Sequence, residues 1–326
     1  MKAIVVSAPG GPEKLELRDV LEPVPGEGEV LVSVRATALN RADLLQRRGV
    51  YPPPPGASDV LGLECAGVVS ALGPGVARAR VGDRVMALLA GGGYAERTAV
   101  HERLLLPIPE RFSFEEATAV PEAFLTATEA LFGVGHLVAG ECVLIHAAAS
   151  GVGTAALQLA REIGATIVAV ASGAKLERIR ELAPAARFVD RTTDDFVAAV
   201  HEASGGRGAD VIVDFVGAAY AAKHAECLAT LGRHVVVGLL GGAKAEIDLA
   251  RLLARRQTLA GMVMRTRPLA DKIAVVERFR RDWLHRLEDG RLRPIIDTVM
   301  SLTDARVAHE RMEANENVGK IVLRVG

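Results

Sequence analysis

Residues 143–161 read Val143-Leu-Ile-His-Ala-Ala-Ala-Ser150-Gly151-Val152-Gly153-Thr-Ala-Ala-Leu-Gln-Leu-Ala-Arg161. An apolar run ends in a turn of small residues, and an amphipathic helix follows at once. This order predicts a strand, a tight turn and a helix N-terminus, where free backbone N–H groups can bind a pyrophosphate. Small residues in the turn leave the backbone open to close approach. An ordinary strand–helix turn is the alternative interpretation.

The surrounding sequence repeats this alternation of apolar strands and amphipathic helices. It predicts a doubly wound parallel sheet, because continuous apolar strands separated by helices are covered on both faces. The expected strands are 143–147, 166–171, 187–190, 210–216, 234–240 and 259–264. The expected helices are 154–163, 175–182, 193–203, 221–231 and 249–256.

The first 120 residues have a different composition. Short β-type runs at 29–35, 67–70 and 83–89 alternate with Pro- and Gly-rich turns, which is typical of a compact, mostly-β unit. After residue 268 we expect a charged helix at 271–288 with Trp283 on its buried side, a strand at 295–300, a helix at 303–314 and a strand at 320–325. The α/β chain is therefore predicted to form one domain from 1–122 completed by 268–326, and another from 123–267.

Composition narrows the class of protein. Of the 326 residues, 50% are hydrophobic and 24% are charged, which is compatible with large buried cores and not with a disordered chain. The formal net charge of -1 provides no overall field to attract nucleic acid or anionic lipid, so neither partner is expected. Three scattered cysteines, no signal peptide and no membrane-length apolar run favour the cytoplasm.

The end of the second expected parallel strand indicates which dinucleotide binds. NAD-binding folds usually have an acidic residue there, about 20 positions after the glycine turn, to bind the ribose 2′-OH. Here Ser172 and Lys175 follow the strand instead, and a hydroxyl with a cation suits a 2′-phosphate. The sequence therefore favours NADPH. A helix cap at Ser172 and a solvated Lys175 are the alternative.

These patterns extend to motifs along essentially the whole chain. They are Ala38-Leu-Asn40-Arg41-Ala-Asp43-Leu, Tyr51-Pro-Pro-Pro-Pro-Gly56, Leu61-Gly62-Leu-Glu64-Cys-Ala-Gly67, Gly82-Asp83-Arg84-Val85, Pro121-Glu-Ala-Phe-Leu-Thr126-Ala127, the Ser150–Gly153 turn and Asn317-Val-Gly319-Lys320-Ile-Val. With them the chain resembles the zinc-independent quinone oxidoreductases of the medium-chain dehydrogenase/reductase superfamily. It is most similar to the branch that contains the mammalian tumour-suppressor-inducible quinone reductase. The resemblance implies a GroES-like catalytic domain and a Rossmann domain.

Two positions bear on metal use. By the resemblance, zinc-dependent relatives have a Cys where this chain has Asn40 and a His where it has Leu63, and neither side chain here is a good zinc ligand. No metal is therefore expected. One departure concerns the cofactor: relatives often have a Tyr where this chain has Asp190, and a carboxylate there repels a phosphate. Arg191 is either its compensation or a surface residue.

The resemblance implies a set of cofactor contacts and a reaction. The expected contacts are Thr126, Ser150, Gly151, Val152, Gly153, Ser172, Lys175, Val216, Gly217, Gly238, Leu239, Leu240, Met264, Asn317 and Lys320. Hydride would pass from nicotinamide C4 to a quinone bound between the domains. Tyr51 and Asn40 are the candidate catalytic residues, because a phenol or amide can donate to the quinone oxygen as charge develops. The alternative is that Tyr51 packs against an apolar loop and that Asn40 caps a turn.

Two other functions remain open from the sequence. One is reduction of an activated C=C bond in an enone or enoyl thioester, and the other is an NADPH-loaded binding or sensor protein with negligible turnover. The resemblance also suggests a homodimer, with edge strands pairing near 259–264.

Overall fold

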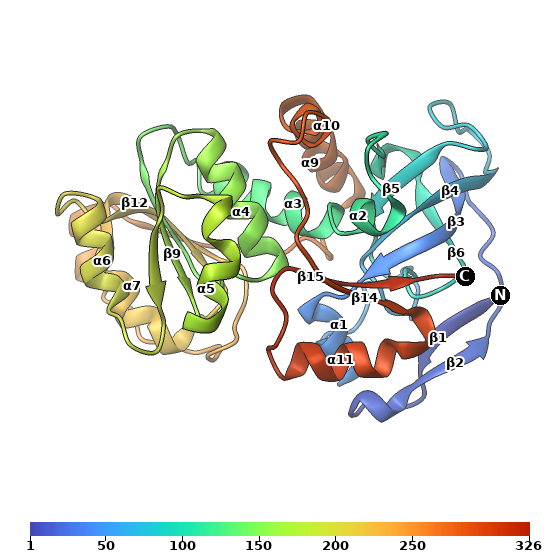
Figure 1. The fold of residues 1–326 in the computed structure, drawn as a ribbon, viewed down its shortest axis with the longest axis horizontal. Helices are drawn as coiled ribbons and strands as arrows, with labels where there is room; N and C mark the ends of the chain where they lie inside the picture. Colours follow the sequence, from blue (N-terminus) through green and yellow to red (C-terminus); the bar gives the residue numbers. More distant parts are fainter. The chain divides into compact units, whose positions relative to one another are not determined.

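The computed structural model describes residues 1–326, which divide into two compact units. The first unit comprises Met1–Leu125 together with Met264–Gly326, and the second comprises Thr126–Val263. The C-terminal segment thus completes the unit that the N-terminal segment begins. Figure 1 shows both chain ends beside the strands of the first unit.

A seven-stranded sheet forms the centre of the first unit. Its strands follow the order β14-β15-β3-β4-β5-β7, and β6 also pairs with β3. The C-terminal strand pairs antiparallel with β3, with Val322 opposite Ala38, and this pairing joins the C-terminal segment to the sheet of the N-terminal segment. The strands are β3 (Glu29–Ala38), β4 (Glu64–Leu72), β5 (Arg84–Leu88), β6 (Arg97–His101), β7 (Leu105–Pro107), β14 (Ile296–Ser301) and β15 (Lys320–Arg324). A separate hairpin consists of β1 (Lys2–Val6) and β2 (Leu15–Asp19).

Short helices connect these strands. They are α1 (Arg41–Arg47), α2 (Phe114–Thr118), α9 (Leu269–Asp282), α10 (Leu284–Glu288) and α11 (Ala305–Glu313), while α3 (Pro121–Thr128) crosses the boundary between the units. The expected single helix at 271–288 is two helices, because Trp283 has φ -131° and interrupts the helical backbone. The Trp283 side chain is buried, as predicted.

The second unit contains a six-stranded sheet in which all pairings are parallel, in the order β10-β9-β8-β11-β12-β13. Helices α4 and α5 cover one face and α6 and α7 cover the other (Figure 1). This arrangement confirms the predicted doubly wound fold. The strands are β8 (Cys142–Ile145), β9 (Thr166–Ala171), β10 (Arg187–Asp190), β11 (Ala209–Asp214), β12 (Leu228–Val236) and β13 (Thr258–Gly261). The helices are α4 (Gly151–Glu162), α5 (Gly173–Ile179), α6 (Phe196–Ala203), α7 (Ala221–Cys227) and α8 (Leu249–Arg255).

Several expected boundaries were wrong, and local hydrogen bonds explain them. Strand β11 ends at Asp214, not at residue 216, because the Asp214 carboxylate accepts the N–H groups of Val216 and Gly217 and turns the chain. Strand β12 runs over Leu228–Val236 where 234–240 was expected, and β13 ends at Gly261 where 264 was expected. The segment at 238–242 bonds to the loop after β11: Leu240 N–H donates to Phe215 and Gly241 N–H to Val216.

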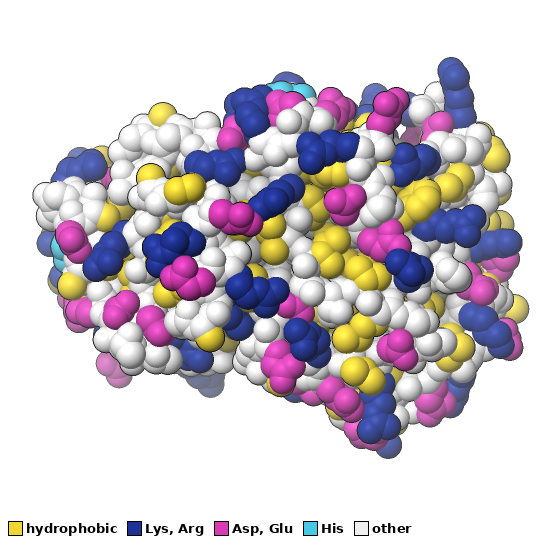
Figure 2. Space-filling model, viewed as in Figure 1, with side chains coloured by type: hydrophobic (Ala, Val, Ile, Leu, Met, Phe, Trp, Pro, Cys, Tyr) yellow, Lys and Arg dark blue, Asp and Glu magenta, His cyan; other side chains and the backbone are white.

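The surface mixes the two signs of charge. On the face shown in Figure 2, basic and acidic side chains alternate over short distances. None of the helices combines the length and the apolar composition needed to cross a membrane.

Candidate active site

The turn after β8 is shaped by a helix cap and by an unusual backbone conformation. Ser150 is the N-cap of α4, and its hydroxyl accepts the N–H of Gly153 at 3.0 Å. Ala147 has φ +47°, in the left-handed region. A Cβ on Gly153 would lie 2.3 Å from the Ala147 carbonyl oxygen, so only glycine fits there. The turn is thus as tight as the sequence predicted.

The N-terminus of α4 suits an anion. The N–H groups of Gly151 and Val152 begin the helix, where no preceding turn supplies acceptors for them. The helix dipole adds a partial positive charge at the same end. The backbone N–H groups at this helix end therefore fit a dinucleotide pyrophosphate.

Three charged side chains, Lys175, Asp190 and Arg191, lie near the end of β9. Arg191 Nε donates to Ser172 Oγ at 3.0 Å, and Lys175 lies in the first turn of α5, which begins beside Ser172. The Asp190 carboxylate accepts the N–H and the hydroxyl of Thr192, and these bonds, with a smaller contribution from the Gly173 N–H, lower the pKa of Asp190. A Cβ on Gly173 would lie 2.0 Å from Asp190 Oδ2, so the carboxylate packs directly on the start of α5. One acid and two cations therefore surround the place expected for a 2′-phosphate.

The loops after β11 and β12 lie side by side. Val216 and Gly217 form the first loop, and Gly238, Leu239 and Leu240 begin the second. Leu239 and Leu240 are exposed, with 53% and 60% of their surface accessible. Both loops follow carboxyl ends of parallel strands, the edge at which open α/β sheets bind nucleotides.

In the first unit, Asn40 belongs to a buried ionic network. Lys320 Nζ donates to Leu39 O at 2.7 Å and to Asn40 Oδ1 at 2.6 Å, and forms a 2.6 Å ion pair with Glu64. The Asn40 amide donates to Glu64 Oε1 at 2.9 Å and to Ala38 O at 3.3 Å. Both amide hydrogens and the amide oxygen of Asn40 are therefore already bonded. The second Glu64 oxygen accepts the Glu122 N–H at 2.8 Å.

Arg265 contacts both the ring and the backbone carbonyl of Tyr51. The Arg265 guanidinium lies over the Tyr51 ring, 5.3 Å from its centroid, and donates to Tyr51 O, Ala90 O and Gln46 Oε1. Burial raises the pKa of the Tyr51 phenol, and Arg265 only partly opposes this. The phenol is thus protonated at neutral pH and able to donate a hydrogen bond.

A second buried acid supports Asn40. The Asp43 carboxylate caps α1 by accepting the Asn40 N–H at 2.7 Å, and it also accepts the Gly62 N–H at 3.1 Å. Burial raises the pKa of Asp43 to about 6, against the opposing effect of these two N–H groups. Asp43 thereby fixes the backbone position from which Asn40 meets Lys320.

The remaining predicted residues are Thr126, Met264 and Asn317. Thr126 is buried in α3, Met264 is buried just after β13, and Asn317 donates to Gly319 O at 2.8 Å. The sequence reasoning did not identify Glu64, Asp43 or Arg265 as site residues. Glu64 and Asp43 stand inside quoted motifs and could have been found, whereas nothing in the sequence near Arg265 points to Tyr51.

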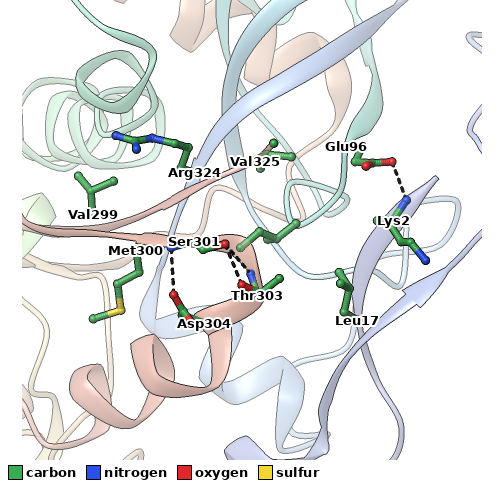
Figure 3. Close-up of a pocket in the computed structure, with 12 residues that line it drawn as sticks. Lys2, Leu17, Glu96, Val299, Met300, Ser301, Thr303, Asp304, Arg324 and Val325 are labelled. Carbon is green, nitrogen blue, oxygen red and sulfur yellow. Dashed lines mark hydrogen bonds between the residues drawn. The ribbon is translucent and has the colours of Figure 1, made fainter.

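A surface hollow of about 580 Å³ elsewhere in the first unit contains none of the predicted residues. It lies between β14, β15 and the β1–β2 hairpin, and Figure 3 shows Lys2, Glu96 and Arg324 around it. Ser301 and Asp304 at its wall bond to each other as a capping box. Its polar groups thus serve the local fold.

Comparison with known proteins agrees with both halves of the chain. The family "Alcohol dehydrogenase GroES-like domain" matches residues 26–110, and "Zinc-binding dehydrogenase" matches residues 151–280. The synaptic vesicle membrane protein VAT-1 homolog of Rattus norvegicus is 33% identical over 100% of this chain and 84% of its own length. This chain belongs to the medium-chain dehydrogenase/reductase superfamily.

Solved structures of the superfamily carry different activities on this fold. An NAD-dependent alcohol dehydrogenase is 34% identical with a TM-score of 0.85, over 100% of both chains. A mycobacterial quinone oxidoreductase is 32% identical with a TM-score of 0.84, over 99% of both chains. The CurK enoyl reductase is 27% identical with a TM-score of 0.87, over 100% of this chain and 99% of its own. As a medium-chain dehydrogenase/reductase the protein is an oxidoreductase that uses a nicotinamide cofactor, and its substrate depends on its own residues.

Proposed function

We propose that the protein is an NADPH-dependent, zinc-independent reductase of quinones. The observation that carries this proposal is the Asn40–Lys320–Glu64 network. By family resemblance, Asn40 stands where zinc-dependent relatives have a ligand, and here all its amide groups are already bonded. Leu63, at the other ligand position, is buried and has no ligand atom.

The reaction then depends on hydrogen bonding by this chain's own residues. The nicotinamide, when bound, supplies the hydride. Tyr51 donates from its phenol to a substrate oxygen that gains negative charge, and Arg265 fixes the loop that carries it. Asn40 is a positioning residue, since it acts through Lys320 and Glu64. Such a site suits an acceptor that is already electrophilic, and quinones have this property.

Tyr51→Phe is expected to lower kcat with a quinone about 100-fold, because the variant loses the one donor to the developing charge. The measurement is steady-state kinetics with NADPH over a panel of quinones, enones and enoyl thioesters. Tyr220→Phe is the matched control, because Tyr220 lies in the second unit and packs against His146.

The same panel separates the alternative functions. Good turnover of enones or enoyl thioesters with no quinone reduced would contradict the quinone proposal and favour C=C reduction. NADPH binding without turnover of any member would favour a binding or sensor protein.

We propose NADPH as the cofactor because Lys175 and Arg191 stand beside Ser172 at the start of α5. Asp190 opposes them, so the preference is a balance of charges. Lys175→Ala should weaken NADPH binding about tenfold, through the loss of one charge-assisted bond, and leave NADH unchanged. Asp190→Asn should tighten NADPH and leave NADH unchanged. Fluorescence titration of both cofactors measures this, and equal effects on the two would contradict a 2′-phosphate site.

We also propose that the protein forms a homodimer through β13. This edge strand pairs only with β12. Exposed apolar side chains lie in it and in the segments before and after it, at Leu249, Leu253, Leu259 and Val263. Apolar side chains on a free strand edge favour association. Sedimentation equilibrium of the wild-type protein tests this proposal.

A further inference from the structure

Four polar side chains gather in the second unit, and the proposed reaction uses none of them. His146 follows β8, Asp214 ends β11, His234 lies in β12 and His224 lies in α7. The strand members share a sheet face, because side chains alternate along a strand and Ile212 pairs with His234. Helix α7 covers that face and brings His224 to it.

The three candidate ligand atoms are close together. Asp214 Oδ2 lies 2.9 Å from His234 Nε2 and 3.5 Å from His224 Nδ1. One ligand atom from each residue lies within 4.8 Å of both others. Asp214 and His224 are fully buried, whereas the His234 side chain is 12% exposed and gives the group contact with solvent.

The hydrogen bonds between His234 and Asp214 and between His224 and His146 leave part of this group unpaired. His224 Nδ1 is buried without a hydrogen-bond partner and faces the Asp214 carboxylate. His224 Nε2 lies 2.8 Å from His146 Nε2, so one of these two nitrogens carries the proton of that bond. If His224 donates, its Nδ1 is a bare lone pair directed at a carboxylate oxygen. A cation between the two atoms would make that arrangement favourable. If His146 donates instead, His224 Nδ1 carries a proton that no acceptor takes with hydrogen-bond geometry.

The donor set identifies the class of cation. Two imidazole nitrogens and one carboxylate oxygen suit zinc and neighbouring divalent transition metals. His146 would accept from the ligating ring's other nitrogen, the arrangement that usually orients a metal-bound histidine.

We propose that Asp214, His224 and His234 form a site for a divalent transition-metal ion of the zinc class, with His146 orienting His224. The ion would join β11, β12 and α7. It would also act on the loop after β11, because Asp214 Oδ1 accepts the N–H groups of Val216 and Gly217. The site therefore stabilises the fold of the second unit, separately from the zinc positions of the superfamily.

The test is titration of the chelator-treated full-length protein with Zn²⁺ by calorimetry, and with Co²⁺ by visible absorption. We expect one ion per chain, Co²⁺ absorption typical of low coordination number, and a rise in Tm with Zn²⁺. Asp214→Asn and His234→Gln should each weaken Zn²⁺ binding at least tenfold. His146→Gln should weaken it about tenfold, as removal of an orienting partner does.

The controls separate the site from surface binding and from misfolding. His285→Gln removes an exposed histidine of α10 and should bind Zn²⁺ like the wild type. Asp214→Asn retains an oxygen for Val216 and Gly217, and circular dichroism checks the fold of each variant. Two results would overturn the proposal: no Zn²⁺ or Co²⁺ bound by the wild type in large excess, or unchanged affinity in folded Asp214→Asn and His234→Gln.

Discussion

Lys320→Met is expected to lower the free energy of unfolding of the first unit by about 3–5 kcal/mol, because it leaves a buried carboxylate without its cation. The Lys320–Glu64 ion pair spans 2.6 Å, with side chains 5% and 0% exposed. After the substitution, Glu64 keeps only the Asn40 amide and the Glu122 N–H as donors. Urea denaturation followed by the fluorescence of Trp283 measures the loss, since Trp283 is the single tryptophan and lies in this unit.

Two further variants test this explanation. Arg324 lies in the same strand as Lys320 and forms an ion pair with Glu115, but its side chain is 60% exposed. Arg324→Met should therefore lower the free energy of unfolding by less than about 1 kcal/mol. Adding Glu64→Gln to Lys320→Met removes the unpaired charge and should recover much of the stability. A double variant as unstable as the sum of the two single variants would show that packing, and not charge, is responsible.

Gly153→Ala is expected to weaken nicotinamide-cofactor binding about 100-fold, by misdirecting two N–H bonds to phosphate of about 1.5 kcal/mol each. The added Cβ would lie 2.3 Å from the Ala147 carbonyl oxygen and 2.7 Å from Ala148 backbone atoms. These neighbours are backbone atoms, which cannot move without displacing the turn, so the turn and the start of α4 must shift. Fluorescence titration with NADPH and NADH measures the change, and both cofactors should lose affinity together.

Gly261→Ala is the matched control for this prediction. It makes the same substitution in the same unit, where an added Cβ meets nothing within 4 Å. Its cofactor affinity should equal that of the wild type. If Gly153→Ala also bound normally while remaining folded, the turn would not be the pyrophosphate site.

The order of the elements could be predicted from the sequence because it depends on short-range patterns. The run at 166–171 and the run at 187–190 became β9 and β10 with the expected bounds, since buried parallel strands are continuous apolar segments. The boundaries at residues 214 and 236 could not be predicted. The first is set by the Asp214 carboxylate, which accepts the Val216 and Gly217 N–H groups. The second involves bonds between segments distant in sequence, because the Leu240 and Gly241 N–H groups donate to the carbonyl oxygens of Phe215 and Val216.

The candidate sites divide in the same way. The turn at Ser150–Gly153 is visible in the sequence because every part of it is contiguous. The partners of Asn40 and Tyr51 cannot be seen in the sequence. Lys320 lies 280 residues from Asn40 along the chain, and Arg265 lies 214 residues from Tyr51. Only folding brings such charges together.

The sequence by itself therefore determined the fold class and the tight turn at Ser150–Gly153, since local pattern encodes both, and the identity of Asn40 and Leu63 is read from it directly. The tertiary structure decided that Asn40 is fully bonded, that Asp190 faces the start of α5, and that His224 and His234 meet at Asp214. The physical reason is that desolvation and pairing of polar groups depend on what burial brings within about 3 Å, and no local pattern specifies those neighbours.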